Sequence, residues 1–194
     1  MINSAEYWEG RYVNSETGWD RGRVSPPLKA YFDQLQDKSI DLLIPGSGNG
    51  YEAEYLFNKG FKNIYVADIA LSPLKNLAKR IPQFPKENMM NINFFEIEKK
   101  FDLIIEQTFF CALPPAFRLS YAEKMQQLLK PKAKLVGILF DFPLTELGPP
   151  FGGRKEEYVN LFKDKFQIHK LERCYNSFPK LSGKELFINF ENKP

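Results

Sequence analysis

The chain has 194 residues, 43% of them hydrophobic and 26% charged, which is enough for one domain with a sizeable core and short for two. Its 27 basic and 24 acidic residues leave a net charge of +3, and the basic residues form no long run, so the charge gives no support to a nucleic-acid partner. The two cysteines, Cys111 and Cys174, lack the C-x-x-C spacing, so neither a disulfide framework nor a metal site is expected.

The compartment is predicted from the cysteine content and from two kinds of segment. So few cysteines favour a reducing compartment. Residues 1–6 contain no basic patch followed by an apolar run, as a signal peptide would, and no apolar run approaches the ~20 residues that span a bilayer. We therefore expect a cytoplasmic, soluble protein without a membrane partner.

Residues 1–36 are predicted to form two helices joined by a loop. Ser4 is suited to cap the first helix. Residues 17–22 contain two glycines and no alternation, which is typical of a loop, and Pro26 suits the first turn of a second helix. We expect these residues, called the N-terminal cover below, to lie over the rest of a single domain spanning 1–194.

Strands and helices alternate in the middle of the chain. Short apolar runs predict strands, and segments with helical spacing of apolar residues predict helices, with Ser72 as a cap and Pro73 at the first position of its helix. The expected strands are 40–44, 63–67, 92–97, 101–106 and 134–141, and the expected helices are 51–58, 72–80 and 115–129. This alternation favours a parallel sheet with helices on both faces.

The C-terminal part follows another pattern. After a helix near 156–166, strand-like segments at 167–175 and 185–190 are joined by a turn at 179–183, with no helix between them. Two such segments are expected to form a hairpin that adds an antiparallel edge to the sheet. Ligands of open α/β sheets bind beyond the carboxyl ends of the strands, so the site is expected there.

A glycine-rich turn follows the first predicted strand. Pro45 is followed by Gly46, Gly48 and Gly50 at alternate positions, which permits positive φ angles and close approach of a ligand to the backbone. Asp68 ends the next strand, near the offset at which an acid reaches a ribose hydroxyl. The last glycine of G-x-G-x-x-G is missing and no phosphate-binding P-loop occurs, so S-adenosylmethionine fits better than a dinucleotide.

At this point the chain resembles the thiopurine S-methyltransferase family, and within it the branch of plant thiocyanate, halide and thiol methyltransferases. The resemblance covers nearly the whole chain. Its matching strings are YWEGRY (7–12), TGWDRG (17–22), IPGSGNG (44–50), ADI (67–69), FDLI (101–104), TFFCALPP (108–115) with Arg118, and GPPF (148–151).

The resemblance implies a class I methyltransferase: a Rossmann-like, doubly wound α/β fold that uses S-adenosylmethionine as methyl donor. Glu106 at the end of the fourth strand and the remaining loop glycines are assigned to the cofactor as well. The cofactor-binding residues expected on this basis are Trp8, Tyr12, Trp19, Gly46, Gly48, Gly50, Asp68, Asn93, Phe94, Glu106 and Arg118. Five positions depart from many relatives: Tyr12 replaces a Trp, Ser47 replaces a Cys, Asn93 replaces an Asp, and Glu106-Gln107 replace an Asp-Tyr pair.

The expected chemistry needs an aromatic pocket more than a general base. Aromatic faces attract a sulfonium cation by about 0.5–2 kcal/mol each. No Ser-His-Asp or Cys-His pairing is apparent, so His169 is interpreted as structural or surface-exposed and Cys111 as a packing residue. The expected substrate pocket consists of Trp19, Phe109, Phe140, Asp141 and Phe151, in which 140–143 and 148–151 form either a lid or a rigid turn.

The sequence thus predicts methyl transfer by in-line displacement to a small soft nucleophile: a thiol, a thiopurine, thiocyanate or a halide. Three alternatives stay open, namely a small-molecule O- or N-methyltransferase, a catalytically silent module that binds S-adenosylmethionine, and an NAD-dependent oxidoreductase. The expected partner is a small-molecule substrate, and the protein is expected to be a monomer or a weak homodimer.

Overall fold

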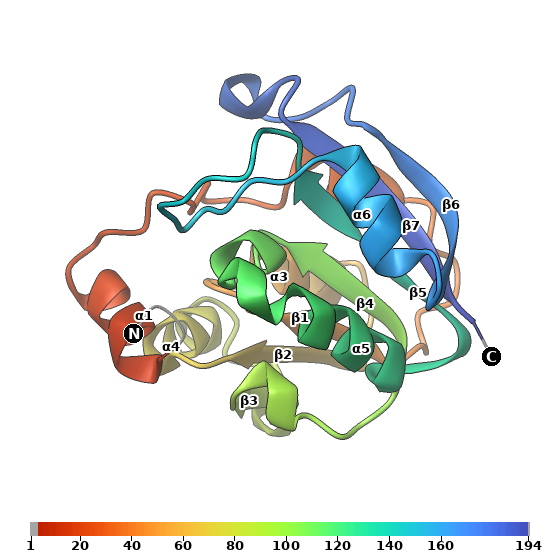
Figure 1. Ribbon diagram of the computed structural model, residues 1–194. Coiled ribbons are helices and arrows are strands. Elements are labelled where there is room, and N and C mark those ends of the chain that lie inside the picture. Colours follow the sequence, from red (N-terminus) through yellow and green to blue (C-terminus); the bar gives the residue numbers. More distant parts are fainter. Residues whose placement is uncertain (1–3, 194) are drawn as a thin grey trace.

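A seven-stranded sheet with the strand order β3-β2-β1-β4-β5-β7-β6 forms the centre of the molecule (Figure 1). The structure is a computed structural model that describes residues 4–193; residues 1–3 of the N-terminal cover and Pro194 lie outside the described residues. The strands are β1 (Leu42–Pro45), β2 (Ile64–Asp68), β3 (Met89–Asn91), β4 (Phe101–Gln107), β5 (Leu129–Phe140), β6 (Phe166–Arg173) and β7 (Glu185–Asn192). The α-helices are α1 (Ala5–Val13), α2 (Pro26–Phe32), α3 (Tyr51–Asn58), α4 (Leu71–Arg80), α5 (Arg118–Leu128) and α6 (Lys155–Phe162).

The strand pairing separates a parallel from an antiparallel part. β1 lies between β2 and β4, and Leu43 of β1 is level with Tyr65 on one side and Ile104 on the other, all in parallel register. β7 pairs antiparallel with both β5 and β6. The predicted mostly parallel sheet and its C-terminal antiparallel hairpin are therefore confirmed.

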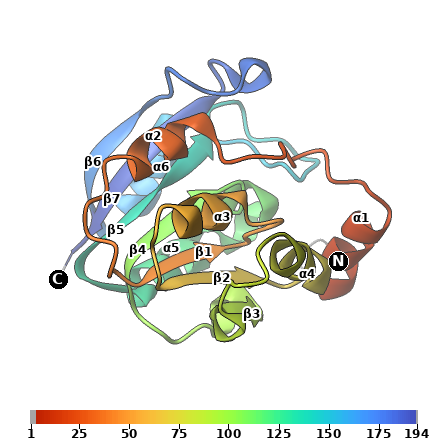
Figure 2. The same ribbon diagram turned by 180° about the vertical axis from the view of Figure 1, so that it is seen from behind.

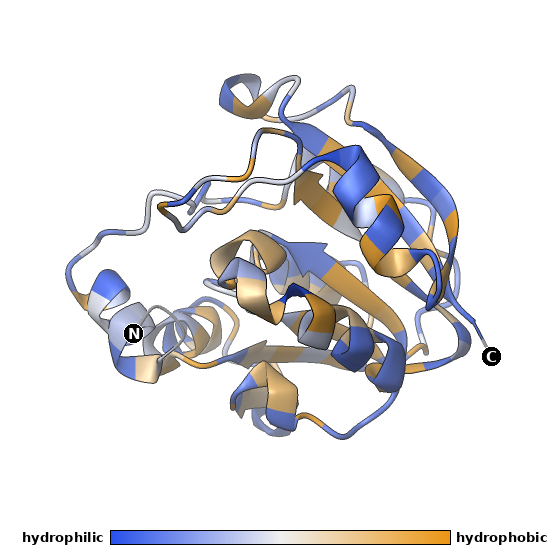
Figure 3. Cartoon of the chain, viewed as in Figure 1, coloured by the Kyte–Doolittle hydropathy of each residue, from blue (hydrophilic) through white to orange (hydrophobic). Residues whose placement is uncertain are grey.

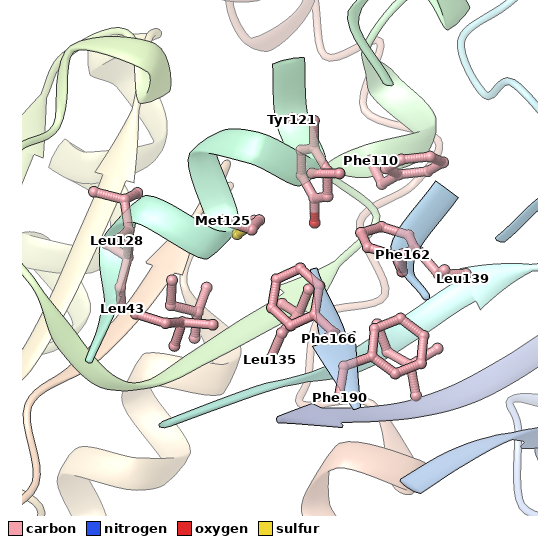
Figure 4. Close-up of a cluster of buried hydrophobic side chains, with 14 of the residues drawn as sticks. Leu43, Phe110, Tyr121, Met125, Leu128, Leu135, Leu139, Phe162, Phe166 and Phe190 are labelled. Carbon is pink, nitrogen blue, oxygen red and sulfur yellow. The ribbon is translucent and has the colours of Figure 1, made fainter. Parts of the chain in front are cut away.

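Helices cover both faces of the sheet because successive strand side chains point to opposite sides. The side chain of Leu43 joins Tyr121 and Phe162 in the core under α5 and α6, in front in Figure 1. Its neighbour Leu42 joins Leu28 and other side chains of α2, α3 and α4 on the opposite face, seen in Figure 2. The first of these clusters is drawn in Figure 4, where aromatic rings of α5, α6, β6 and β7 meet leucines of the strands.

The strands become polar where they reach the carboxyl edge of the sheet. β4 is hydrophobic along most of its length and ends in Glu106 and Gln107, a change that Figure 3 shows at its arrowhead. α1 lies beside α4 at this edge (Figure 1) and contains no fully buried residue. The edge that the topology assigns to ligands is thus bordered by polar strand ends and by the N-terminal cover.

The start of α4 differs from the prediction. The helix begins at Leu71 with Ala70 in the cap position, so Ser72 is not its N-cap and Pro73 is its third residue. The carboxylate of Glu9 on α1 accepts hydrogen bonds from the N–H groups of Leu71 and Ser72, at 2.8 and 2.9 Å, and from the Ser72 hydroxyl. The Glu9 side chain of α1 therefore caps the N-terminus of α4 in place of a local capping residue.

Several other boundaries also shift. The predicted strand 92–97 is wrong: β3 precedes it, and residues 94–96 form a 3-10 turn that the Asn93 side chain caps. A 3-10 turn occupies 115–117 before α5 begins, and β5 follows α5 directly instead of starting at residue 134. α6 ends at Phe162, four residues before the predicted end, and Phe166 is the first residue of β6.

Two possible features are not found in the described part of the chain. Among residues 4–193, no helix has both the length and the apolar character needed to cross a membrane. In the same residues, no three His, Cys, Asp or Glu side chains are grouped so that they could hold a metal ion.

Candidate functional site

A cavity of about 750 Å³ lies at the carboxyl edge of the sheet. Its wall is formed by the glycine turn after β1, the ends of β2 and β4, the N-terminal cover, the segment after β5 and the connection between β6 and β7. The structure brings many of the predicted residues together in this wall. They are Trp8, Tyr12, Trp19, Gly46, Gly48, Asp68, Asn93, Phe94, Phe109 and Phe140.

The glycine turn and Asp68 form one hydrogen-bonded unit. Gly46 and Gly48 have φ angles of 56° and 52°, a region in which glycine carries no steric penalty. The N–H of Gly48 donates to one carboxylate oxygen of Asp68 at 2.9 Å, and the N–H of Ala70 donates to the other at 2.9 Å. Each oxygen keeps a further lone pair, so Asp68 remains able to accept hydrogen bonds from a ligand.

Burial changes the ionisation of Asp68. The residue is 9% exposed, and desolvation raises the pKa of its carboxyl to about 6, against the opposing effect of the two backbone N–H donors. Asp68 is therefore ionised at neutral pH and becomes protonated in mildly acidic solution.

Three aromatic side chains of the N-terminal cover pack edge to face in the wall. The ring of Trp19 lies 5.4 Å from the ring of Trp8 and 5.8 Å from that of Tyr12, measured between centroids. Trp8 and Tyr12 are four residues apart on α1, so both project from one side of that helix. The guanidinium of Arg11 lies over the Trp19 ring, 5.6 Å from its centroid, so this aromatic cluster already attracts one cation.

Phe109 closes the opposite side of the glycine turn. A Cβ atom on Gly46 would lie 2.2 Å from the Phe109 ring, so no other residue fits at position 46 while the ring keeps this place. Phe109 also packs edge to face on Phe94, with 5.1 Å between the centroids. The side-chain oxygen of Asn93 accepts a hydrogen bond from the Phe95 N–H at 3.1 Å, which holds this side chain at the edge of the cavity.

The cavity wall contains buried polar atoms without a partner. Within residues 4–193, the hydroxyls of Ser25 and Ser47 and the side-chain carbonyl of Gln107 form no hydrogen bond. Buried polar groups in native proteins nearly always have a partner. These unpaired polar atoms fit a polar ligand in the cavity.

Glu106 does not lie in the cavity wall, contrary to its expected cofactor contact. It is fully buried on the α5 side of β4, where one oxygen accepts from the N–H groups of Phe109 and Phe110 at 2.8 and 2.9 Å. The other oxygen accepts from the Tyr121 hydroxyl at 2.5 Å. Burial raises the pKa of Glu106 to about 7. Since strand side chains alternate, the neighbouring Gln107 reaches the cavity in its place.

Four further predicted residues lie outside the wall. Gly50 caps α3 with a positive φ and faces Leu77 of the core. Arg118 donates to the carbonyl of Gly152 and stacks over Phe110. Asp141 forms an ion pair with Arg173 at 2.7 Å. Phe151 packs under Gly148, while Pro149 and Pro150 take the place in the wall that we expected for it.

Sequence reasoning missed two acidic residues of the wall. Asp20 accepts hydrogen bonds from the Asn49 side chain and from the Gly22 N–H, and so ties the N-terminal cover to the glycine turn. Glu52 is 7% exposed, and its carboxylate accepts from the Ser25 N–H at 3.0 Å. Asp20 lies within TGWDRG (17–22), one of the strings that carry the family resemblance, and could have been identified from it. Glu52 lies in the first turn of a helix, and the sequence offered no signal for it beyond its charge.

Three basic residues of the wall, Arg21, Arg23 and Lys184, were also missed. Two of them lie in the loop of the N-terminal cover, and Lys184 immediately precedes β7. Arginines and lysines in loops are commonly solvated, so only the three-dimensional arrangement reveals that they share one cavity.

Comparison with known proteins identifies the family. The family model of thiopurine S-methyltransferase matches residues 3–191. A probable thiol methyltransferase of Arabidopsis thaliana is 29% identical over 80% of this chain and 71% of its own length. A thiocyanate methyltransferase of Brassica oleracea is 28% identical over 92% and 81%, and a thiopurine S-methyltransferase of Vibrio campbellii is 24% identical over 95% and 94%.

Solved structures of methyltransferases have the same fold as this chain. The N-methyltransferase NodS from Bradyrhizobium japonicum, in complex with S-adenosylhomocysteine, superposes with a TM-score of 0.72 at 15% identity, covering 99% of this chain and all of its own. Magnesium protoporphyrin IX methyltransferase from Synechocystis, with bound S-adenosylmethionine, gives a TM-score of 0.74 at 12% identity, covering 97% and 95%. The fold is the Rossmann-like fold of class I methyltransferases.

The fold and the match over nearly the whole chain together define an S-adenosylmethionine-dependent methyltransferase. The chain belongs to the thiopurine S-methyltransferase family.

Proposed function

We propose that this methyltransferase transfers the methyl group of S-adenosylmethionine to a small soft nucleophile, a thiol, thiopurine, thiocyanate or halide, by in-line displacement. The cofactor supplies an electrophilic methyl group on a positively charged sulfur. The observation that carries the proposal is a cavity lined by the rings of Trp8, Tyr12, Trp19 and Phe109 next to a glycine turn and a buried acid. We further propose that residues 1–194 act as one domain.

Different residues of the cavity wall are available to bind different parts of the cofactor. The backbone turn around Gly46 and Gly48 lines the cavity, and Asp68 offers lone pairs to ribose hydroxyls. Trp8, Tyr12 and Trp19 offer their faces to the positive charge. Phe94 and the amide of Asn93 border the place where the adenine would lie.

The chemistry of the wall favours an acceptor that needs no strong general base. His169 pairs with Glu191 at 3.1 Å on the exposed edge strand, away from the cavity. Burial strongly raises the pKa of the Cys111 thiol, so this wall residue is a poor nucleophile. A thiolate, thiocyanate or halide reacts without help from either, provided that the cavity aligns it and excludes water.

We also propose that the protein acts in the cytoplasm on small molecules, as a monomer or a weak homodimer, with no nucleic-acid partner. The near-neutral charge balance of 27 basic and 24 acidic residues supports this proposal. Light scattering after size-exclusion chromatography would test the oligomeric state.

The test is incubation with radiolabelled S-adenosylmethionine and a panel of iodide, thiocyanate, bisulfide, aryl thiols and thiopurines, with analysis of volatile and soluble products. We expect labelled methyl product from at least one soft nucleophile and none from matched alcohols and amines. Turnover of the alcohols or amines alone would identify an O- or N-methyltransferase and contradict the proposal. Tight binding of the cofactor without any turnover would identify a silent binding module instead.

A further inference from the structure

The cavity wall contains acidic and basic side chains that differ in their hydrogen bonding. The acids Asp20, Glu52 and Asp68 lie beside the glycine turn, and each carboxylate accepts at least one N–H hydrogen bond from the protein. The basic residues Arg21, Arg23 and Lys184 form a second set, which we call the cation rim. The two sets therefore offer different chemistry to a ligand.

The cation rim forms no ion pair in the described part of the chain; one nearby acid is the buried Glu185, whose pKa is raised by burial while the charge of Arg21 opposes that rise. Among residues 4–193, no carboxylate oxygen lies within 4.0 Å of Arg21, Arg23 or Lys184, and the side-chain nitrogens of these residues donate no hydrogen bond. Arg11 in the same wall differs, since it pairs with Glu16 at 3.5 Å. Three unpaired cations at the mouth of one cavity create a positive potential that attracts an anionic group.

Phe178 and Ser25 lie near the cation rim and contribute to the same cavity wall. The guanidinium of Arg23 lies 5.3 Å from the centroid of the Phe178 ring, and Phe178 itself lines the cavity. Two residues after Arg23, Ser25 is 3% exposed and its hydroxyl, in the same wall, has no hydrogen-bond partner within residues 4–193. A buried unpaired hydroxyl beside free guanidinium groups is suited to donate a hydrogen bond to an anion.

The rim residues come from two segments that are distant in sequence and that line the same cavity as the glycine turn. Arg21 and Arg23 belong to the segment between α1 and α2, and Lys184 belongs to the β6–β7 connection, which runs along the top of Figure 1. α1 and α4 lie lower and to the left in that view. The volume of about 750 Å³ lies in the upper part of the range for ligand pockets, so an organic acceptor has room within the cavity.

We propose that the acceptor is an organic thiol that carries a second, anionic group such as a carboxylate, and that the cation rim binds this group. The inference rests on the proposed function. The thiol loses its proton to solvent, its sulfur uses an electron pair to form the new bond to the methyl carbon, and the sulfur of the departing S-adenosylhomocysteine keeps the pair of the broken bond. The carboxylate stays unchanged and serves to position the sulfur.

The experiment compares 4-mercaptobenzoate with its methyl ester, two thiols that differ mainly in the charge remote from sulfur. We expect a kcat/KM about tenfold higher for the acid at low ionic strength, and a loss of this advantage at high salt. In Arg23→Gln and in the triple variant Arg21→Gln, Arg23→Gln, Lys184→Gln, the ratio of kcat/KM for the acid to kcat/KM for the ester should fall toward one. Lys180→Gln is the matched control, because Lys180 is exposed on the same β6–β7 connection and does not line the cavity.

A second readout does not depend on turnover. Calorimetry with protein saturated with S-adenosylhomocysteine should detect binding of 4-(methylthio)benzoate, weakened at least fivefold in the triple variant and unchanged in Lys180→Gln. An acid-to-ester ratio near one in the unaltered protein, or a ratio that the triple variant leaves unchanged, would overturn the cation rim while leaving thiol methylation intact. Methylation of thiocyanate or iodide but of no thiol would overturn this inference and leave the proposed function standing. Methylation of none of the soft nucleophiles would contradict the proposed function, and calorimetry would then still decide whether the rim binds the carboxylate.

Discussion

Asp68 is the residue on which the donor site depends most. It lies at the end of β2, both of its oxygens accept backbone N–H groups, and it is close to fully buried. Hydrogen bonds to a charged group contribute about 1.5–3 kcal/mol. We expect Asp68→Ala to weaken binding of S-adenosylmethionine by this amount in calorimetry; unchanged affinity would remove Asp68 from the site.

The raised pKa of Asp68 makes the same contact dependent on pH. Because the pKa of the buried carboxyl is about 6, Asp68 takes up a proton as the pH falls from 7 to 5 and loses its charged acceptor. Affinity for the donor should fall over this interval, by up to about tenfold for each pH unit below 6. Asp68→Asn should bind weakly with a flat profile; an equally steep profile in this variant would refute the assignment.

Trp19 is held in the cavity wall by its contacts with Trp8 and Tyr12. Trp19→Ala removes one aromatic face and loosens the other two, so we expect turnover and donor affinity to fall together, with about 0.5–2 kcal/mol of binding lost for the cation–aromatic contact alone. Steady-state kinetics and calorimetry on one preparation would measure both. A fully active variant would count against the aromatic wall.

At the residue scale, the sequence indicated several residues that the structure places in one cavity wall, while their roles toward a ligand stay predictions. Gly46 and Gly48 need positive φ, Asp68 ends a strand, and Trp19 stands in a loop without helical partners, so each indicated a ligand. Glu106 was misassigned because the end of β4 offers two adjacent polar residues that point to opposite sides. Only the structure reveals that Tyr121 and two backbone N–H groups satisfy Glu106 and that Gln107 takes the cavity side.

At the scale of elements, the contact of α1 with α4 decides how the N-terminal cover is held. α1 has no fully buried residue, so packing contributes little to its position. Glu9 compensates by accepting the hydrogen bonds of the first turn of α4, where no local cap exists. Hydrogen bonds from Ser72 lower the pKa of Glu9, so the contact persists into acidic solution.

We expect Glu9→Ala to destabilise the protein by about 1 kcal/mol, the usual cost of a lost N-cap. It should also weaken donor binding, because Trp8 and Tyr12 lie on the helix that is released. Hydrogen exchange should be faster in α1 and in the first turn of α4. Glu6→Ala is the control, since Glu6 makes no hydrogen bond to α4; equal effects of the two substitutions would show that Glu9 has no special role.

The predicted bounds agree closely with the structure for some elements and not for others. α3 has the predicted bounds and β4 differs by one residue. β3 was displaced because Met89–Asn91 is short and only partly apolar, whereas Ile92–Ile97 looks more strand-like in sequence. The start of α4 was misjudged because its cap comes from Glu9, 62 residues away from Leu71, which no local pattern can reveal.

At the scale of the whole molecule, buried carboxyl groups control stability against pH. Burial raises the pKa of Asp68 to about 6 and that of Glu106 to about 7, above the values of about 3.9 and 4.3 in an unfolded chain. Between pH 5 and 7.5 the folded state therefore binds protons that the unfolded state has released, so stability falls as the pH rises. Exposed carboxyl groups with lowered pKa, such as Asp33, are ionised in both states over this range and do not oppose the trend.

Urea unfolding without donor should give a lower free energy of unfolding at pH 7.5 than at pH 5. Glu106→Gln should reduce this slope, because the amide oxygen still accepts from the two N–H groups but no proton is exchanged. An unfolding free energy that rises over the interval, or an equal slope in Glu106→Gln, would contradict the assignment.

The overall architecture could be predicted because the alternation of strands and helices, followed by a hairpin, admits few topologies. The path of the N-terminal cover and of the β6–β7 connection around the cavity could not, because loops carry no period and their contacts are set by distant residues such as Asp20 and Asn49. The cation rim was missed for that reason, since it unites loop residues from opposite ends of the chain.

The most direct test of the account is a crystal structure with S-adenosylhomocysteine. We predict the nucleoside between the turn at Gly46–Gly48 and the rings of Trp8, Tyr12 and Trp19, with a ribose hydroxyl on Asp68. A nucleoside bound elsewhere, or an empty cavity in crystals soaked at saturating concentration, would contradict the assignment of this cavity as the donor site.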